Sequence, residues 1–206
     1  MTIAEVVSLA QNGELKSIAV KNDLSAVIGF INLGLIELYK RFPLNIKEVI
    51  IDISDPLVTE YQLPTDFMWI VTAYGEVPSN SPVVRLKHLP INSEDDVYSI
   101  NTIGWNTVQI PSSVPGNAVS IMYVAEPPVF TVNDTALDIP IPSQMIEALL
   151  NYIGYRGHGS IKGDIKAESN THYRRFEASV ARLIAEGMFN EESIEMKTKL
   201  GDRGFK

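Results

Sequence analysis

The sequence contains no cysteine among its 206 residues, which excludes disulfide bonds and metal sites built on thiolates. It also lacks any apolar run approaching the roughly 20 residues that a membrane-spanning helix needs. Its first residues show no basic segment followed by an apolar one, as a secretory signal would have. We therefore expect a soluble protein that is made inside the cell and is large enough to bury a core without covalent staples.

Basic residues are scarce in the middle of the chain. Residues 46–137 contain three of them, Lys47, Arg85 and Lys87, against eleven acidic residues. The whole net charge of −8 therefore lies in this segment, whereas both ends of the chain are balanced. Acidic surface repels phosphate, so this composition speaks against a protein that grips nucleic acid. Solubility is the simpler explanation of the same charge.

Motifs for catalysis and cofactor binding are also missing. The three histidines, His88, His158 and His172, have no partner at metal-ligand spacing, and we expect surface or capping roles for them. The sequence has no phosphate-binding loop and no nucleophile elbow. Glu94–Asp96 could bind a cation weakly or supply carboxylates for glycan cleavage, although a solvated loop is the simpler interpretation. We therefore predict that the chain is not an enzyme and holds no cofactor or metal ion.

Two helices are predicted near the C-terminal end, where no proline follows residue 142. In the first, apolar residues recur from Met145 at the i, i+4, i+7 spacing of an apolar helix face. The second runs from about residue 164 to 186 and ends at Gly187, a usual residue just after a helix. We interpret the glycine-rich stretch 154–159 between them as the turn of a helical hairpin.

Two further helices are predicted near the N-terminal end. Thr2–Glu5 has the form of a capping box, which begins a short helix. Asp23 can cap a long helix that ends before Pro43, with apolar residues at i, i+3, i+4 and i+7 and on much of its other side. Gly29 and Gly34 each cost this helix about 1 kcal/mol relative to alanine. Close packing of the helix against the C-terminal hairpin would explain both glycines.

Between residues 46 and 137 the pattern changes to that of short β-strands. Seven or so β-branched or alternating segments are separated by turn residues at spacings of about 8–12 residues, which is typical of an antiparallel sandwich or small barrel. The candidate strands are Ile46–Ile53, Val58–Leu63, Phe67–Tyr74, Val83–His88, Val97–Ile103, Thr107–Ile110 and Ala118–Ala125, with Val129–Val132 as a further candidate.

Together these elements predict an α+β fold, in which a helical bundle formed by both chain ends carries an inserted antiparallel β-sandwich or barrel. The helical bundle is assigned to residues 1–45 and 138–187, and the acidic β domain to residues 46–137. Residues 188–206 form an extended C-terminal tail without a clear period. Its apolar residues suggest docking on another chain, although a frayed terminus explains them equally well.

Two groups of residues are candidates for contacts with other chains. Arg174 and Arg175 lie beside Tyr173 on the last predicted helix, where they could contact a partner or a phosphate, or simply face solvent. The candidates in the tail are Phe189, Ile194, Met196, Leu200 and Phe205. Without any enzyme signature, these features favour a structural or binding protein.

Several stretches of the sequence, taken together, match a known arrangement of a long apolar helix, a step into a first strand and a closing helical pair. They are Leu24–Phe42 with Asn32 and Glu37–Phe42, then Leu63–Phe67, Asp138–Arg156 and Tyr173–Phe176. In these stretches the chain resembles the head-to-tail adaptors of tailed bacteriophages, in particular the tail tubular protein A type of short-tailed phages. That family is expected to have alanine or larger apolar residues where this chain has Gly154 and Gly157, so the helix–helix junction is expected to differ.

The resemblance implies a structural virion protein rather than an enzyme. It implies a ring of twelve subunits that docks under the portal protein, bridges the capsid vertex to the tail nozzle protein and leaves a channel through which DNA passes without specific binding. Such a protein is assembled in the host cytoplasm, is located in the neck and tail of the virion, and has no membrane contact. An acidic β domain near the channel would let DNA slide without sticking.

A different class of function also fits the sequence, namely glycan binding or glycan cleavage by the β domain on a helical base. Trp69, Trp105 and the tyrosines could stack on sugars, and Glu94–Asp96 could supply carboxylates. An aromatic row on one exposed face would favour this function, whereas burial of both tryptophans would favour the adaptor. A subunit of some other scaffold with the same two-part build is a third interpretation.

Overall fold

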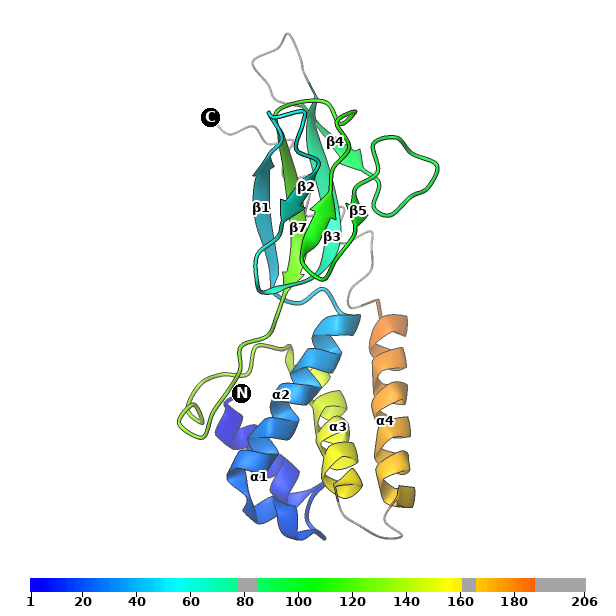
Figure 1. Ribbon diagram of the computed structural model, residues 1–206. Helices are drawn as coiled ribbons and strands as arrows, with labels where there is room; N and C mark the ends of the chain where they lie inside the picture. The colour runs from blue at the N-terminus through cyan, green and yellow to red at the C-terminus, as the bar shows by residue number, and fades with distance from the viewer. Residues whose placement is uncertain (78–84, 161–165, 188–206) are drawn as a thin grey trace. The chain divides into compact units, whose positions relative to one another are not determined.

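The computed structural model describes residues 1–77, 85–160 and 166–187, and the chain divides into two units (Figure 1). The helical unit contains Met1–Phe42 together with the described residues that follow Glu126. The β unit contains Pro43–Glu126. Helices and antiparallel sheets are both present, so the predicted α+β class is confirmed.

Capping side chains set where the N-terminal helices begin. Thr2 and Glu5 form the predicted capping box, in which each backbone N–H donates to the side chain of the other residue. Asp23 caps the long helix by accepting from the backbone N–H of Ala26 at 3.0 Å.

Among the described residues, no helix is long and apolar enough to cross a membrane. The helices are α1 (Ile3–Asn12), α2 (Leu24–Arg41), α3 (Ile146–Gly159) and α4 (Lys166–Ala185), with 3₁₀ turns at Ala19–Asn22 and Ser143–Met145.

The long helix α2 packs against α3, as predicted, and Gly34 lies at their contact. A Cβ on Gly34 would lie 2.5 Å from Cδ1 of Leu149 and 3.2 Å from Cδ1 of Tyr152, so glycine permits this close approach. The same explanation is wrong for Gly29, where a Cβ would meet nothing within 4 Å. The prediction that α2 is buried nearly all round is also wrong, because Leu33 is 38% exposed.

The glycine-rich end of α3 is helical, so the predicted turn at these glycines is wrong. The helix continues through Gly154 and Gly157 and ends at Gly159. A Cβ on Gly154 would lie 2.7 Å from Nδ1 of His172, and one on Gly157 would lie 2.3 Å from Cδ2 of Leu15. Glycine lowers intrinsic helix stability by about 1 kcal/mol, but packing supplies most of a helix's stability in a protein. These glycines are therefore contact points rather than helix breakers.

The β unit consists of two antiparallel sheets, with strand orders β1-β7-β3-β4 and β2-β6-β5. They share one apolar core, to which Ile51 and Ile121 contribute from the larger sheet and Val108 from the smaller one. In the described residues the sheets do not close, so the barrel alternative is wrong and an open two-sheet arrangement is found. The strands are β1 (Ile46–Asp52), β2 (Glu60–Gln62), β3 (Phe67–Val77), β4 (Arg85–Leu89), β5 (Asn101–Thr102), β6 (Thr107–Gln109) and β7 (Ala118–Ala125).

The predicted strand Val58–Leu63 is shortened to β2, and in two other predicted strands side chains take over backbone hydrogen bonds. The candidate Val129–Val132 forms no strand, since its backbone is bonded to the side-chain amide of Asn32. The predicted strand 97–103 is shortened to β5. Its first half is a turn in which the Asp96 carboxylate accepts from the backbone N–H of Tyr98 at 2.8 Å.

Candidate functional site

Helix α4 carries the described part of the predicted interface. Arg174 and Arg175 are both exposed on it. Within the described part of the chain, neither guanidinium has an ion-pair partner. Their role in contacts with other chains stays a prediction. The other predicted interface residues lie outside the described residues: Phe189, Ile194, Met196, Leu200 and Phe205.

The apolar face of α4 determines which side of the helix meets solvent. Phe176, Val180 and Leu183 are almost fully buried, and their spacing of i, i+4, i+7 places them on one face. The Phe176 ring contacts the ring of Tyr152 on α3, with the centroids 5.2 Å apart. Because this face is fixed against the bundle, the opposite face of α4 presents Arg174 outward, whereas Arg175 and Arg182 line the groove beside α3.

A bidentate ion pair ties α4 to α2. Nη1 and Nη2 of Arg41 donate to the two carboxylate oxygens of Glu177, each at 2.7 Å. The Arg41 guanidinium also lies over the Phe176 ring, 4.9 Å from its centroid. The hydrogen bonds from Arg41 hold the pKa of Glu177 below its usual range, and burial opposes this shift. Glu177 is therefore ionised at neutral pH and fixes the position of α4 from the solvent side.

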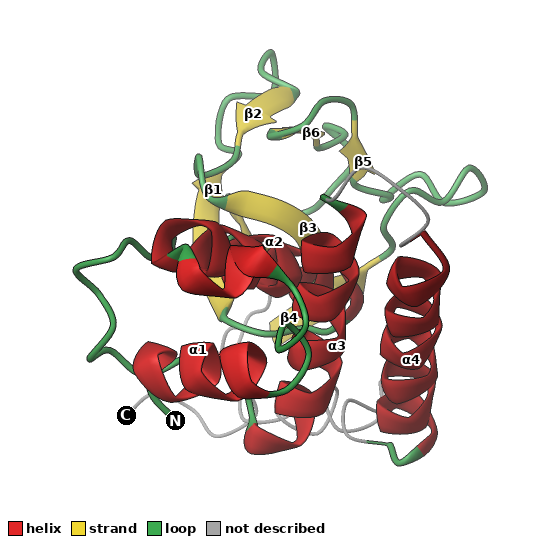
Figure 2. Cartoon of the chain, turned by 90° about the horizontal axis from the view of Figure 1, so that it is seen from below, coloured by secondary structure: helices red, strands yellow, loops and turns green. Residues whose placement is uncertain are grey.

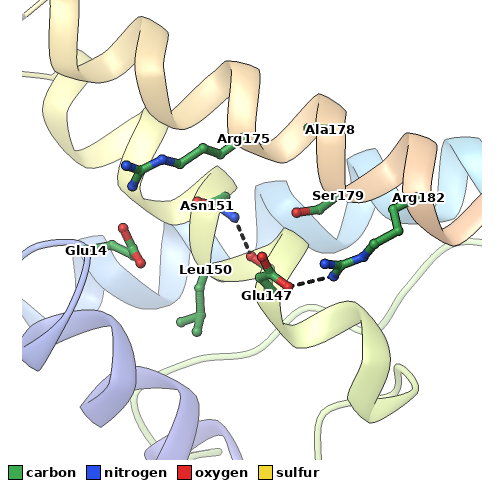
Figure 3. A pocket seen from close by; sticks show the side chains of 8 residues that line it. All are labelled: Glu14, Glu147, Leu150, Asn151, Arg175, Ala178, Ser179 and Arg182. Atoms are coloured by element: carbon green, nitrogen blue, oxygen red, sulfur yellow. Dashed lines mark hydrogen bonds and ion pairs between the residues drawn. The ribbon is translucent and has the colours of Figure 1, made fainter.

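A groove of about 540 Å³ lies between α3, α4 and the turn that follows α1 (Figure 3). Within it, the Glu147 carboxylate pairs with Arg182 at 2.6 Å, and the Asn151 side chain donates to the backbone carbonyl of Glu147 at 3.0 Å. The groove is lined by Glu14, Glu147, Leu150, Asn151, Arg175, Ala178, Ser179 and Arg182.

A pair of buried histidines contacts Glu14, which lines this groove, so the expected surface or capping role is wrong for two of the three. His158 and His172 are 3% and 9% exposed, and their rings stack with centroids 5.0 Å apart. Both contact Glu14: Nε2 of His158 lies 3.0 Å from its backbone oxygen, and Nδ1 of His172 lies 3.2 Å from its carboxylate. Gly154 leaves the space that the His172 ring fills. In the described residues no cluster of acidic and histidine side chains could hold a metal ion.

The sequence analysis missed a second exposed surface of the helical unit, the loop 127–138. Three of its apolar side chains face solvent: Val129 is 77% exposed, Leu137 53% and Val132 46%. The run of β-branched and aromatic residues 129–132 lies in this loop, and its composition predicts a strand rather than an exposed loop. An exposed apolar cluster on an ordered loop is typical of a protein contact site.

The features of the β unit that suggested glycan chemistry do not converge on one site. Trp105 is 70% exposed in the turn between β5 and β6, whereas Trp69 is half-buried in β3. Glu94–Asp96 is exposed, and the Asp96 carboxylate already accepts the backbone N–H of Tyr98. Of the two tryptophans, only Trp105 is therefore exposed enough to stack on a sugar ring, and the acidic residues Glu94–Asp96 lie in a solvent-exposed loop.

Comparison with known proteins gives one family. Residues 1–194 match the family model described as SU10 adaptor protein. The match covers the whole helical unit, the whole β unit and the first residues of the tail. Comparison with curated protein sequences gives no match.

Proposed function

The chain belongs to the SU10 adaptor protein family, and we propose that it forms a head-to-tail adaptor ring that joins the portal protein to the tail. Membership of this family supports a structural role as an adaptor of the phage virion. The family match is the observation that carries the proposal, because it spans residues 1–194 and so includes both units.

The proposed ring has twelve copies of the chain, as in adaptors of the tail tubular protein A type. Portal protein lies on one side of it and tail nozzle protein on the other, and DNA leaves the capsid through its channel. The charge of the chain supports the channel, because the acidic segment 46–137 repels DNA phosphates and so lets DNA pass without binding. The ring would be assembled in the host cytoplasm and remain in the neck of the virion.

Each part of the chain has a separate role in this proposal. The helical unit, to which the loop 127–138 belongs, makes the ring contacts and the portal contacts, which suits the exposed arginines of α4. The β unit projects outward or towards the tail. The tail 188–206 docks on a neighbouring copy.

Imaging of the purified protein by electron microscopy, with and without portal rings of the same phage, tests the proposal. We expect ring-shaped particles whose density adds to one end of the portal. Protein that neither forms rings nor binds portal would overturn the proposal.

Deleting residues 188–206 tests the proposed role of the tail. We expect weaker assembly with an unchanged helical circular dichroism signal, because the deletion removes none of the buried core residues of the described chain. Sedimentation velocity measures the assembly. Unchanged incorporation of the shortened chain into particles would remove the tail from the proposal.

Glycan binding by the β unit is a second candidate, and the exposure of Trp105 is the observation that favours it. An indole that is 70% exposed in a turn is available for stacking on a sugar ring. Titration with cell-surface oligosaccharides, followed by tryptophan fluorescence, tests this candidate. A saturable change that is lost in Trp105→Ala would support it, and a flat titration would reject it.

A further inference from the structure

The loop 127–138 exposes apolar side chains although it is firmly held. Val129 and Leu137 are more than half exposed, but Phe130 between them is buried. The side-chain amide of Asn32 on α2 both donates to the Phe130 carbonyl at 2.9 Å and accepts from its N–H at 3.0 Å. Because the loop is anchored, its exposed apolar side chains are held at the surface in fixed positions, where they can contact a partner.

The far end of the same loop is held by backbone hydrogen bonds to the start of α1. The N–H groups of Ile3 and Ala4 donate to the carbonyls of Leu137 and Thr135, both at 2.9 Å. The middle of the loop is closed by Asp134, whose carboxylate accepts from the backbone and hydroxyl of Thr131. A loop that is ordered before it binds loses little conformational entropy on docking.

The exposed face of α4 has the complementary chemistry. Arg174 lies near its centre, Arg175 lies on the flank that lines the groove, and Ile184 (60% exposed) and Tyr173 (39% exposed) lie on the opposite flank. By contrast, the loop contains two acidic residues and no basic one: Asp134 has no ion-pair partner among the described residues, whereas Asp138 pairs with the N-terminal ammonium of Met1 at 3.3 Å. An acidic apolar loop and a basic apolar helix face are complementary in charge.

The two surfaces lie on opposite sides of the helical unit. In both views the loop 127–138 and α4 are separated by α2 and α3 (Figures 1 and 2). One copy therefore cannot join its own loop to its own α4. A contact between the loop of one copy and α4 of the next is heterologous, and contacts of this kind build a ring when the rotation from copy to copy closes.

We infer that the loop 127–138 docks on the exposed face of α4 of the neighbouring copy of this chain, and that this contact builds the ring. The inference rests on the proposed function. A two-fold contact is disfavoured, because it would need the loop and α4 of each copy to meet the same partner at once, and they lie on opposite sides of the helical unit.

Cross-linking tests the contact cleanly, because the chain has no cysteine of its own. Val129→Cys and Ala178→Cys are prepared as separate full-length proteins, both at exposed positions. A short bismaleimide cross-linker is added to each protein alone and to their mixture. We expect cross-linked dimers in the mixture and not in either protein alone, and a ladder of multimers when one chain carries both cysteines.

A charge placed on the loop tests the same contact by a second measurement. Val129→Lys should raise the concentration needed for half-assembly by about tenfold or more, because the new ammonium is desolvated in the contact and repelled by the arginines of α4. Val97→Lys is the matched control: Val97 is 68% exposed in the β unit, and this variant should assemble normally. Sedimentation velocity reports assembly, and an unchanged circular dichroism spectrum shows that the monomer is folded.

The outcomes separate this inference from the proposed function. Rings that form without the Val129–Ala178 cross-link, or that survive Val129→Lys, overturn the loop contact and leave the adaptor ring intact. Dimers of Val129→Cys alone indicate a two-fold contact, and cross-links from the loop to added portal protein indicate a portal site; either result also overturns it. Unmodified protein that neither assembles nor binds portal overturns both.

Discussion

Among single residues, Gly154 sets how closely α3 and α4 approach. Gly154→Ala would place a methyl group 2.7 Å from Nδ1 and 2.9 Å from Cγ of His172. The His172 ring is buried and stacked on His158, so it has little room to move. We expect the variant to lose about 1–3 kcal/mol of unfolding free energy through overpacking, even though alanine favours a helix by about 1 kcal/mol. Chemical denaturation followed by circular dichroism measures the loss.

Gly29→Ala is the matched control, because it makes the same change in a helix of the same unit. A Cβ on Gly29 meets nothing within 4 Å, so this variant should be as stable as the parent or up to about 1 kcal/mol more stable. If both variants unfold at the same denaturant concentration, Gly154 is not a contact point.

The Arg41–Glu177 pair predicts a pH dependence of the helical unit. The pKa of Glu177 is lowered in the folded chain by hydrogen bonds from Arg41, so the folded state binds fewer protons than the unfolded state. The stabilisation is therefore complete above the unfolded pKa of about 4.3 and is lost as the pH falls through the lower folded pKa. Glu177→Gln should remove this part of the acid dependence and cost roughly 0.5–1 kcal/mol at pH 7, because the pair is partly exposed.

Denaturation midpoints between pH 7 and 3 measure this dependence. Asp52→Asn provides a control in the β unit: its pKa is also lowered, but by hydrogen bonds from Ser54 within one turn. The control should leave the acid response of the helical circular dichroism signal unchanged. A Glu177→Gln protein with the parent's acid response would show that the ion pair contributes nothing to stability.

Residue roles that depend on distant neighbours were not predictable from the sequence. Glu14 and His158 are 144 positions apart, and no local period links them. The sequence pattern indicates only helix propensity and apolar spacing, and on these grounds Gly154 and Gly157 are predicted to end the helix. The pattern does not show that side chains from other elements occupy the space beside these glycines.

Among the elements, the loop 127–138 depends on one side chain of α2. Asn32→Ala would remove both hydrogen bonds to the backbone of Phe130. We expect a cost of about 1–3 kcal/mol, because partly buried backbone groups lose their partner, together with faster hydrogen exchange of the Phe130 amide. Exchange followed by mass spectrometry or NMR measures this release.

Asn12→Ala is a suitable control for the loop, since the Asn12 amide bonds Ser8 within its own helix. That change should leave exchange at Phe130 as it is in the parent. Equal protection of Phe130 in the Asn32→Ala protein would show that the loop is held by its α1 contacts alone.

The elements with a strong period were predicted well, and those governed by side-chain hydrogen bonds were not. The apolar residues of α2 recur over the whole helix, and this pattern together with the Asp23 cap located it correctly. The segment Val129–Val132 has strand-like residues, but Asn32 satisfies its backbone. Propensity describes the conformation that a segment favours on its own. Here the hydrogen bonds from Asn32 on α2 determine the conformation of the segment instead.

For the whole molecule, two units with separate cores should unfold separately. Both tryptophans, Trp69 and Trp105, lie in the β unit, so tryptophan fluorescence reports that unit. Helical circular dichroism reports the other. Leu35→Ala, which removes a fully buried side chain of α2, should shift the circular dichroism midpoint by the equivalent of about 2–5 kcal/mol and leave the fluorescence midpoint unchanged. Equal shifts of both midpoints would show one cooperative unit.

The pairing of chain ends in the helical unit has a consequence for synthesis on the ribosome. α1 and α2 emerge first, but their partner α3 follows the entire β unit, and the bond from His158 to Glu14 closes a separation of 144 residues. The contiguous β unit can fold as soon as it leaves the exit tunnel. Until α3 and α4 have been translated, Ile31, Leu35 and Leu38 of α2 have no partner helix to cover them. We therefore expect chaperones to bind the nascent chain during this period.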